Sequence, residues 1–363
     1  MEMTDLFRNA YQNKKVFVTG HTGFKGSWLS LWLAELGATV KGYALAPENN
    51  SLYSNIQNEL KIQSIISDIR DKDRLEKEIL DFQPDFILHL AAQPLVRYSY
   101  EQPIETFEVN AIGTANLLQA VTKLQNKCSV VIVTTDKVYE NREQDYAYCE
   151  DDKLAGYDPY SSSKACAELI VQSYRLSFFN PEQFGSHKKS IASARAGNVI
   201  GGGDYAKDRI VPDIVRALQN NEAVSIRNPR SIRPWQHVLD PLAGYLLLGA
   251  KMAANPEKHS TAYNFGPDPS DAVTVEDLVK ASITILGKGS YQNEPAKDNL
   301  HEAGLLKLNS RKAKEELSWK PVFTAREAIA KTIEWYKSRA ERNSDMFGLC
   351  MDDIKNFELR SRS

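Results

Sequence analysis

Tyr160 and Lys164 have the side-chain types and the spacing for proton chemistry. Residues four apart on a helix lie on the same side, one turn apart. A tyrosine hydroxyl has a pKa of about 10, but a neighbouring ammonium group favours the phenolate. Such a pair can remove the proton from a substrate hydroxyl. The alternative interpretation is a solvent-exposed tyrosine–lysine pair without a catalytic role.

A second group, Thr135-Asp136-Lys137, follows a β-branched run at 129–134 that predicts a buried strand. In doubly wound sheets, the carboxyl ends of parallel strands line the ligand site. An acid and an amine at such a position can exchange protons with a substrate. The alternative is that Asp136 and Lys137 form a solvated surface pair.

The elements that would position these residues begin with a glycine-rich turn containing Gly20, Gly23 and Gly26. A predicted strand at 15–19 precedes the turn, and a predicted helix at 25–36 and a strand at 38–44 follow it. This order is typical of a dinucleotide-binding unit, in which the backbone N–H groups at the helix start receive a pyrophosphate. The alternative is an accidental cluster of glycines in a loop.

Further strands are predicted at 63–67, 85–90, 129–134 and 190–196, and further helices at 71–81, 104–125 and 159–178. This alternation predicts an α/β fold built on a Rossmann-type, doubly wound parallel sheet. Later helices are predicted at 212–220, 239–253, 274–286, 325–338 and 346–357. We expect a dinucleotide-binding domain at 1–197, completed by later segments. Residues 198–363 would mainly form a smaller mixed α/β substrate domain and a C-terminal tail.

The composition excludes several classes of protein. Of 363 residues, 42% are hydrophobic and 25% charged, as in ordinary globular proteins. The net charge of -2 argues against nucleic-acid binding. No apolar run is long enough to cross a membrane, and residues 1–15 do not resemble a signal peptide. The four cysteines lack CxxC spacing, which predicts reduced thiols and a cytoplasmic location. The six histidines lack metal-ligand spacing, so we expect no bound metal.

Three motifs together resemble one family: Gly20–Trp28, Thr135–Tyr139 and Tyr160–Lys164. The chain is similar to the extended short-chain dehydrogenase/reductase superfamily, in its nucleotide-sugar 4,6-dehydratase branch. The GxxGxxG spacing and the YxxxK motif about 140 residues later carry this resemblance, which covers roughly residues 10–340. Asp-Lys replaces the usual Asp-Glu pair after the threonine. That change and the opening GHTGFKGSW resemble the CDP-glucose branch.

The resemblance implies a lyase that converts CDP-glucose to CDP-4-keto-6-deoxyglucose, with internal hydride transfer from C4 to C6 through bound NAD. It implies that Thr135 binds the substrate hydroxyl and that Tyr160, beside Lys164, takes the C4 hydroxyl proton. Asp136 would protonate the leaving C6 hydroxyl, and Lys137 stands where relatives carry the C5 base. Other 4,6-dehydratases or 4-epimerases on the same fold remain alternatives, as does a non-catalytic NAD-binding scaffold.

The resemblance also implies two sets of binding residues. Those for NAD, besides Tyr160 and Lys164, are Gly20, His21, Thr22, Gly23, Phe24, Lys25, Gly26, Asp68, Ile69, Leu90, Ala91, Ala92, Gln93 and Thr134. Those for the sugar nucleotide are Asn198, Arg209, Arg227, Arg233 and His237. The arginines suit a diphosphate because the guanidinium fork matches phosphate oxygens.

One feature of typical NAD sites is missing. An acidic residue usually follows the first glycine by about 20 residues and binds the ribose hydroxyls. Here the strand end reads Lys-Gly-Tyr-Ala-Leu at 41–45, with no acid before Glu48. No arginine is present there to hold the 2′-phosphate of NADP. We still expect NAD, because the implied reaction regenerates its cofactor.

The assembly and the pathway are also expectations. Helices 104–125 and 159–178 carry apolar residues on more than one side, such as Leu117, Leu118, Val121, Leu169, Ile170 and Tyr174. Paired helices of this kind form a twofold interface in the family, so we expect a homodimer. The resemblance suggests a deoxysugar product for a bacterial surface polysaccharide, such as the O-antigen of lipopolysaccharide.

Overall fold

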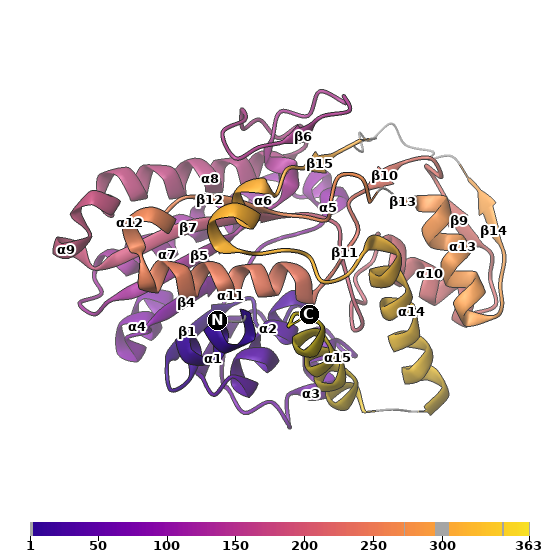
Figure 1. The fold of residues 1–363 in the computed structure, drawn as a ribbon, viewed down its shortest axis with the longest axis horizontal. Helices are drawn as coiled ribbons and strands as arrows, with labels where there is room; N and C mark the ends of the chain where they lie inside the picture. Colours follow the sequence, from indigo (N-terminus) through magenta and orange to yellow (C-terminus); the bar gives the residue numbers. More distant parts are fainter. Residues whose placement is uncertain (1–2, 272, 295–304, 343–344, 363) are drawn as a thin grey trace.

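A seven-stranded parallel sheet forms the centre of the molecule (Figure 1). The computed structural model describes residues 3–271, 273–294, 305–342 and 345–362. The strand order is β12-β7-β5-β4-β1-β2-β3, and all pairs are parallel. The strands are β1 (Lys15–Thr19), β2 (Thr39–Ala44), β3 (Gln63–Ile66), β4 (Phe86–His89), β5 (Cys128–Val133), β7 (Lys189–Ala196) and β12 (Ala262–Phe265). The predicted Rossmann-type sheet is confirmed.

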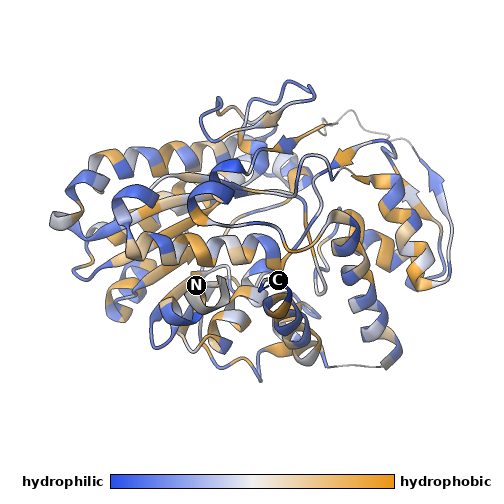
Figure 2. Ribbon diagram, in the orientation of Figure 1, coloured by the Kyte–Doolittle hydropathy of each residue, from blue (hydrophilic) through white to orange (hydrophobic). Residues whose placement is uncertain are grey.

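Two apolar cores cover the two faces of this sheet, because side chains alternate across a strand. Val16 and Val18 of β1 pack into a core with α1 (Met3–Tyr11), α2 (Phe24–Glu35) and α11 (Leu239–Ala254). Phe17 points to the opposite core, which includes α4 (Lys72–Phe82), α7 (Gly113–Thr122) and α8 (Pro159–Ser177). The hydrophobic central strands therefore lie between two helix layers (Figure 2).

The helix predicted at 104–125 is interrupted. It consists of α6 (Pro103–Phe107), a π-helical segment at Glu108–Ile112 and α7. Within the π-helical segment, the side-chain amide of Asn110 accepts from Gln93 N and donates to the Ser163 hydroxyl. Widened turns of this kind occur frequently at functional sites. The edge strand β12 was not predicted, because its four residues carry no alternating pattern.

A second lobe lies beyond the carboxyl ends of the strands (Figure 1). It includes α10 (Ile210–Gln219), α13 (Val275–Leu286), the pair β9 (Val224–Ile226) and β14 (Tyr291–Asn293), and the pair β10 (Ile232–Arg233) and β13 (Val273–Thr274). Between the lobes, β8 (Val199–Ile200) pairs with β11 (Gln236–His237), and β6 (Ala147–Tyr148) with β15 (Lys307–Leu308). Later elements α11 and β12 return to the main sheet. The domain boundary at residue 197 stays a prediction.

Shorter and C-terminal helices complete the fold. They are α3 (Leu52–Ile56), α5 (Val96–Glu101), α9 (Phe184–His187), α12 (Pro256–His259), α14 (Ala325–Arg342) and α15 (Met346–Arg360), with short helical turns at Asp136–Val138, Pro181–Gln183 and Ala313–Leu317. Helix α15 packs on α2 and α3. There, Trp32 donates to Glu358 (2.9 Å) and its ring meets Phe357 edge-on. In the part of the chain that the structure describes, no helix has the length and apolarity needed to cross a membrane.

Candidate active site

The glycine-rich turn closes tightly on the neighbouring strands. Gly20 has a φ of +77°, in the left-handed region, and a Cβ there would lie 2.7 Å from Ala91 N. A Cβ at Gly26 would lie 1.9 Å from the Gly20 carbonyl oxygen, so this close approach requires glycine. Gly23 is the N-cap of α2, and no side chain covers the N–H groups of the first turn. This backbone fits the approach of a pyrophosphate.

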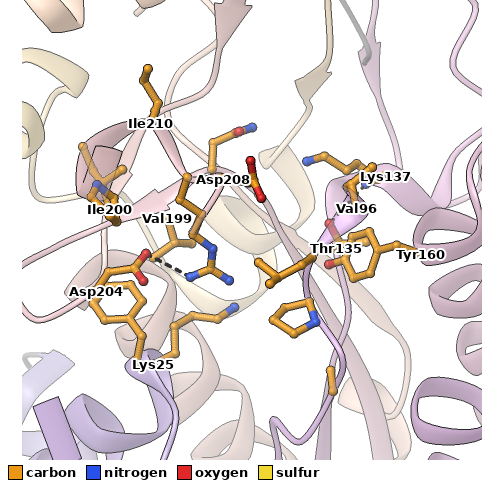
Figure 3. A pocket seen from close by; sticks show the side chains of 18 of the residues that line it. Lys25, Val96, Thr135, Lys137, Tyr160, Val199, Ile200, Asp204, Asp208 and Ile210 are labelled. Atoms are coloured by element: carbon orange, nitrogen blue, oxygen red, sulfur yellow. Dashed lines mark hydrogen bonds and ion pairs between the residues drawn. The ribbon is translucent and has the colours of Figure 1, made fainter. Parts of the chain in front are cut away.

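A cavity of about 880 Å³ extends from this turn along the carboxyl ends of the strands into the second lobe (Figure 3). The strand ends contribute Tyr43, Ala44, Leu45, Ser67, Asp68, Ile69, Leu90, Ala91 and Ala92 to its wall. The end of β2 thus brings only aromatic and aliphatic side chains. The acid that lines this end of the cavity is Asp68, and the Arg70 guanidinium beside it lowers the pKa of its carboxyl.

Helix α8 brings Tyr160 to the cavity within its first turn. The helix begins at Pro159, and the Asp158 side chain caps it by accepting from Ser161 N (2.9 Å). Tyr160 lines the cavity, and Lys164, one turn later, donates to the Val133 carbonyl oxygen (3.1 Å). Burial raises the pKa of Tyr160 to about 12, and a hydrogen bond with Thr135 is the largest opposing effect. Burial lowers the pKa of Lys164 to about 8.

The segment after β5 gathers polar groups around Asp136, which is fully buried. The Thr135 hydroxyl donates to its Oδ1 (2.9 Å), and Lys137 Nζ lies 3.0 Å from the same oxygen. Asn198 Nδ2 donates to Oδ2 (3.3 Å). Thr135, Lys137 and Asn198 all line the cavity, so Asp136 lies directly behind its wall. The alternative of a solvated Asp136–Lys137 surface pair is therefore wrong for Asp136.

Cationic side chains line the cavity opposite Thr135 and Tyr160 (Figure 3). Arg209, just before α10, pairs with Asp204 (2.9 Å), and Arg227 and Arg233 also line the cavity. Lys25 Nζ lies 3.5 Å from the Tyr245 hydroxyl. Burial, together with the charges of Lys164 and Arg209, lowers the pKa of Lys25 to about 7, and the charge of Asp136 opposes this shift.

Four expected binding residues do not reach the cavity with their side chains: His21, Gln93, His237 and Lys164, whose ammonium donates to the Val133 carbonyl oxygen. The imidazole of His21 fills the space above Gly42, where a Cβ would lie 2.3 Å from the ring, and bonds Ser64. His237 is fully buried, with its ring edge-on to Trp28 and Phe323. The Gln93 amide instead bonds Thr106 and the Leu95 backbone. The expected substrate contact of His237 therefore has no geometric support, because apolar packing encloses the ring.

Three residues of the site were not anticipated. Asp204 forms an ion pair with Arg209. Arg97 lines the cavity, and its Nε lies 3.9 Å from Asp208 Oδ1. Glu168 is buried behind Thr134 and accepts from its hydroxyl (2.5 Å). Only Glu168 had a sequence signal, because it lies four residues after Lys164 and so continues the same face of the helix.

Comparison with known proteins identifies the family. The model of the family described as GDP-mannose 4,6 dehydratase matches residues 17–332. The chain belongs to this 4,6-dehydratase family. The family lies within the extended short-chain dehydrogenases, as the motifs predicted.

Individual relatives agree with this family assignment. The chain is 48% identical over 351 residues to "CDP-glucose 4,6-dehydratase" of Salmonella typhimurium, covering 96% of this chain and 98% of that protein. It is 27% identical to human "dTDP-D-glucose 4,6-dehydratase", covering 89% and 90%. A dTDP-glucose 4,6-dehydratase from Streptomyces venezuelae, solved with NAD bound, superposes with a TM-score of 0.76 at 23% identity, covering 91% and 98%. At 23% identity, this last likeness shows a shared fold.

Proposed function

We propose that this member of the 4,6-dehydratase family converts CDP-glucose to CDP-4-keto-6-deoxyglucose with NAD as a recycled cofactor. The observation that carries the proposal is a buried acid, Asp136, hydrogen-bonded to Thr135, which also bonds Tyr160. Loss of water needs such an acid at C6, in addition to the groups that oxidise C4. The relative of 48% identity, named CDP-glucose 4,6-dehydratase, supports the choice of nucleotide.

The site fits NAD at the turn between β1 and α2. Gly20, Gly23 and Gly26 leave the backbone open to a pyrophosphate, and Asp68 and Ile69 line the cavity nearby. NAD, when bound, would accept hydride from C4, return it to C6 and carry a positive ring charge beside Tyr160. Ala44 and Leu45 line the cavity at the end of β2, so this strand end offers the cofactor no acidic partner.

Tyr160 would remove the C4 hydroxyl proton during oxidation. Its burial disfavours the phenolate, so it needs cations nearby. The charge of Arg209 lowers the pKa of Tyr160, and Lys164 lies one helical turn away. Thr135, which bonds Tyr160, is placed to bond the same substrate hydroxyl.

Asp136 and Lys137 would carry the elimination. A C4 ketone makes the C5 proton acidic, and the C6 hydroxyl leaves when it is protonated. Asp136, in its protonated form, would deliver a proton to the leaving C6 hydroxyl. Lys137 Nζ, 3.0 Å from Asp136 Oδ1, would either take the C5 proton as a neutral amine or, as an ammonium, stabilise the enolate while another group takes that proton.

Arg209, Arg227 and Arg233 would bind the diphosphate of the sugar nucleotide, with Asn198 near the sugar. All four line the cavity on the side of the second lobe. Guanidinium groups suit this role because they bind phosphate oxygens bidentately. In this view, residues 198–363 mainly bind the substrate and residues 1–197 the cofactor.

The reaction is tested with CDP-glucose deuterated at C4, and the product is analysed by NMR. We expect deuterium at C6, loss of one water and no net reduction of NAD. A 4-epimerase would return deuterium to C4, and a scaffold protein would give no turnover. CDP-, UDP-, GDP- and dTDP-glucose compared in the same assay test the nucleotide, and turnover of another nucleotide above CDP-glucose contradicts its assignment.

We further propose a homodimer that works in the cytoplasm and supplies a deoxysugar for a surface polysaccharide such as O-antigen. Leu117, Leu118 and Val121, expected at the interface, are instead buried in the chain's own core. Other apolar side chains of the same helices and their ends are more than half exposed, namely Ile104, Ile112, Leu169, Leu176 and Phe178. They support a twofold contact through α6–α7 and α8.

A further inference from the structure

Glu168 continues the catalytic face of α8. Tyr160, Lys164 and Glu168 follow one another at intervals of four residues, so they lie on one side of the helix. All three are buried, and Glu168 is only 4% exposed. A buried carboxyl needs partners for its oxygens or it becomes neutral.

Four donor groups meet the Glu168 carboxylate. Oε1 accepts from the Thr134 hydroxyl (2.5 Å) and Arg195 Nε (3.0 Å). Oε2 accepts from the Ser193 hydroxyl (2.7 Å) and Arg195 Nη2 (3.0 Å). The carboxylate thus joins the ends of β5 and β7 to the catalytic helix.

These contacts reach the catalytic groups through the backbone. Thr134 lies between Val133, whose carbonyl accepts from Lys164, and Thr135, which bonds Tyr160. A shift of Thr134 would therefore move the partners of both Lys164 and Tyr160. Glu168 does not line the cavity, so it acts on the cavity through Thr134 and its neighbours.

Charge gives Glu168 a second effect. Arg195 and the two hydroxyls hold the pKa of the Glu168 carboxyl below its ordinary value despite burial. Its negative charge in turn raises the pKa of Lys164, which burial alone lowers. The other charged or titratable groups around these two are Tyr160 and Arg175 on α8, Lys25 on α2, His89 on β4, Asp136 after β5 and Arg195 on β7.

We propose that Glu168 is a positioning residue for the reaction: its buried carboxylate places a negative charge one helical turn beyond Lys164 and, through Thr134, holds the end of β5 in place. The inference rests on the proposed function, since it concerns the group that supports the base. Its specific consequence is a change in the pH range of activity, beyond a loss of stability.

The test measures kcat for CDP-glucose between pH 6 and 10 with NAD-loaded enzyme. Activity of the unaltered protein should fall at alkaline pH as Lys164 loses its proton. In Glu168→Gln the raising charge is gone, so this fall should begin about one pH unit lower. Glu168→Asp keeps the charge, so the alkaline fall should stay near its original position even if kcat drops.

Folding is controlled separately. Glu168→Gln leaves the Arg195 charge buried and unpaired, which is strongly destabilising. The double variant Glu168→Gln with Arg195→Gln removes both charges, is checked by thermal melts, and should also show the downward shift. Ser193→Ala removes one neutral hydrogen bond to the same carboxylate and should leave the pH range unchanged.

An equal loss of activity at every pH in the glutamine variants would overturn the proposal and leave Glu168 a structural residue. A pH shift in Ser193→Ala equal to that of Glu168→Gln would also overturn it, because the charge would then not be the cause. Absence of turnover in the unaltered protein would instead refute the proposed function.

Discussion

Hydrogen-bond donors surround the Asp136 carboxylate on one side, and the backbone of a glycine lies against it on the other. Thr135, Lys137 and Asn198 surround its oxygens, and Gly197 lies against the carboxylate. The proposed acid therefore has one allowed position, set by residues of two neighbouring strands.

Replacing Tyr160 with Phe removes the proposed base and keeps the ring. We expect the oxidation step to slow by about 10²–10⁴-fold, while the affinity for CDP-glucose, measured by calorimetry, changes little. Single-turnover absorbance at 340 nm reports the oxidation. Reduction of NAD at nearly the original rate would show that Tyr160 is not the base.

Lys137→Ala should impair elimination and spare oxidation, because the amine pairs with Asp136 and not with Tyr160. Mixing this variant with CDP-glucose in a single turnover should cause absorbance at 340 nm to accumulate with a 4-keto-glucose nucleotide. Normal turnover without such accumulation would make Lys137 a bystander.

Gly197→Ala should displace the acid, since the new Cβ would lie 1.9 Å from Asp136 Oδ2. We expect water loss to slow more than oxidation, as measured by the same single-turnover assay. Gly185→Ala is the matched control, because a Cβ there meets no atom within 4 Å. Equal rates in the two variants would contradict the close contact.

Among the elements, those with strong periodicity or clear boundary signals were predictable. Six strands of the central sheet, α2, α4, α8 and α11 lie within two residues of their predicted bounds. The break in helix 104–125 was not predictable, because the π-helical segment depends on the tertiary contacts of Asn110 with Gln93 and Ser163. The short strand β12 forms because β7 offers an open edge, which no local pattern reveals.

The C-terminal helix α15 allows a test at this scale. Phe357 is fully buried between Trp32 and Phe323, so Phe357→Ala should lower the free energy of unfolding by about 3–5 kcal/mol. Leu359→Ala on the same helix is the control, because Leu359 is 68% exposed; its effect should stay within about 0.5 kcal/mol. Equal denaturant midpoints for both variants would contradict the packing of α15.

For the whole molecule, the proposed homodimer is tested by a charge on α8. Leu176 is 62% exposed, and Leu176→Glu should convert a dimer into a monomer, because a buried carboxylate at a twofold contact occurs twice. Light scattering at micromolar concentration gives the mass. Leu359→Glu is the control for a charge placed elsewhere, and a monomeric unaltered protein would refute the proposal.

The site as a whole was only partly predictable. Motifs located Thr135, Asp136, Lys137, Tyr160 and Lys164, and the structure brings these residues together at one end of the sheet. The packing of His237 against Trp28 and Phe323 was not predictable, because it joins segments more than 80 residues apart. Asp204 and Arg97 carry no local signal, since the closed fold alone brings them to the cavity.

The position of α15 also has a consequence for the order of synthesis. Helix α2 follows the glycine-rich turn and leaves the ribosome early, yet Trp32 on that helix packs against Phe357 of α15, a helix synthesised much later. Domains fold from the N-terminus during translation, so the side of the Trp32 indole that meets Phe357 stays exposed in the nascent first half until α15 has been synthesised. A stop codon just before α15 would leave this side of Trp32 exposed permanently, as an apolar surface that quality-control proteases recognise.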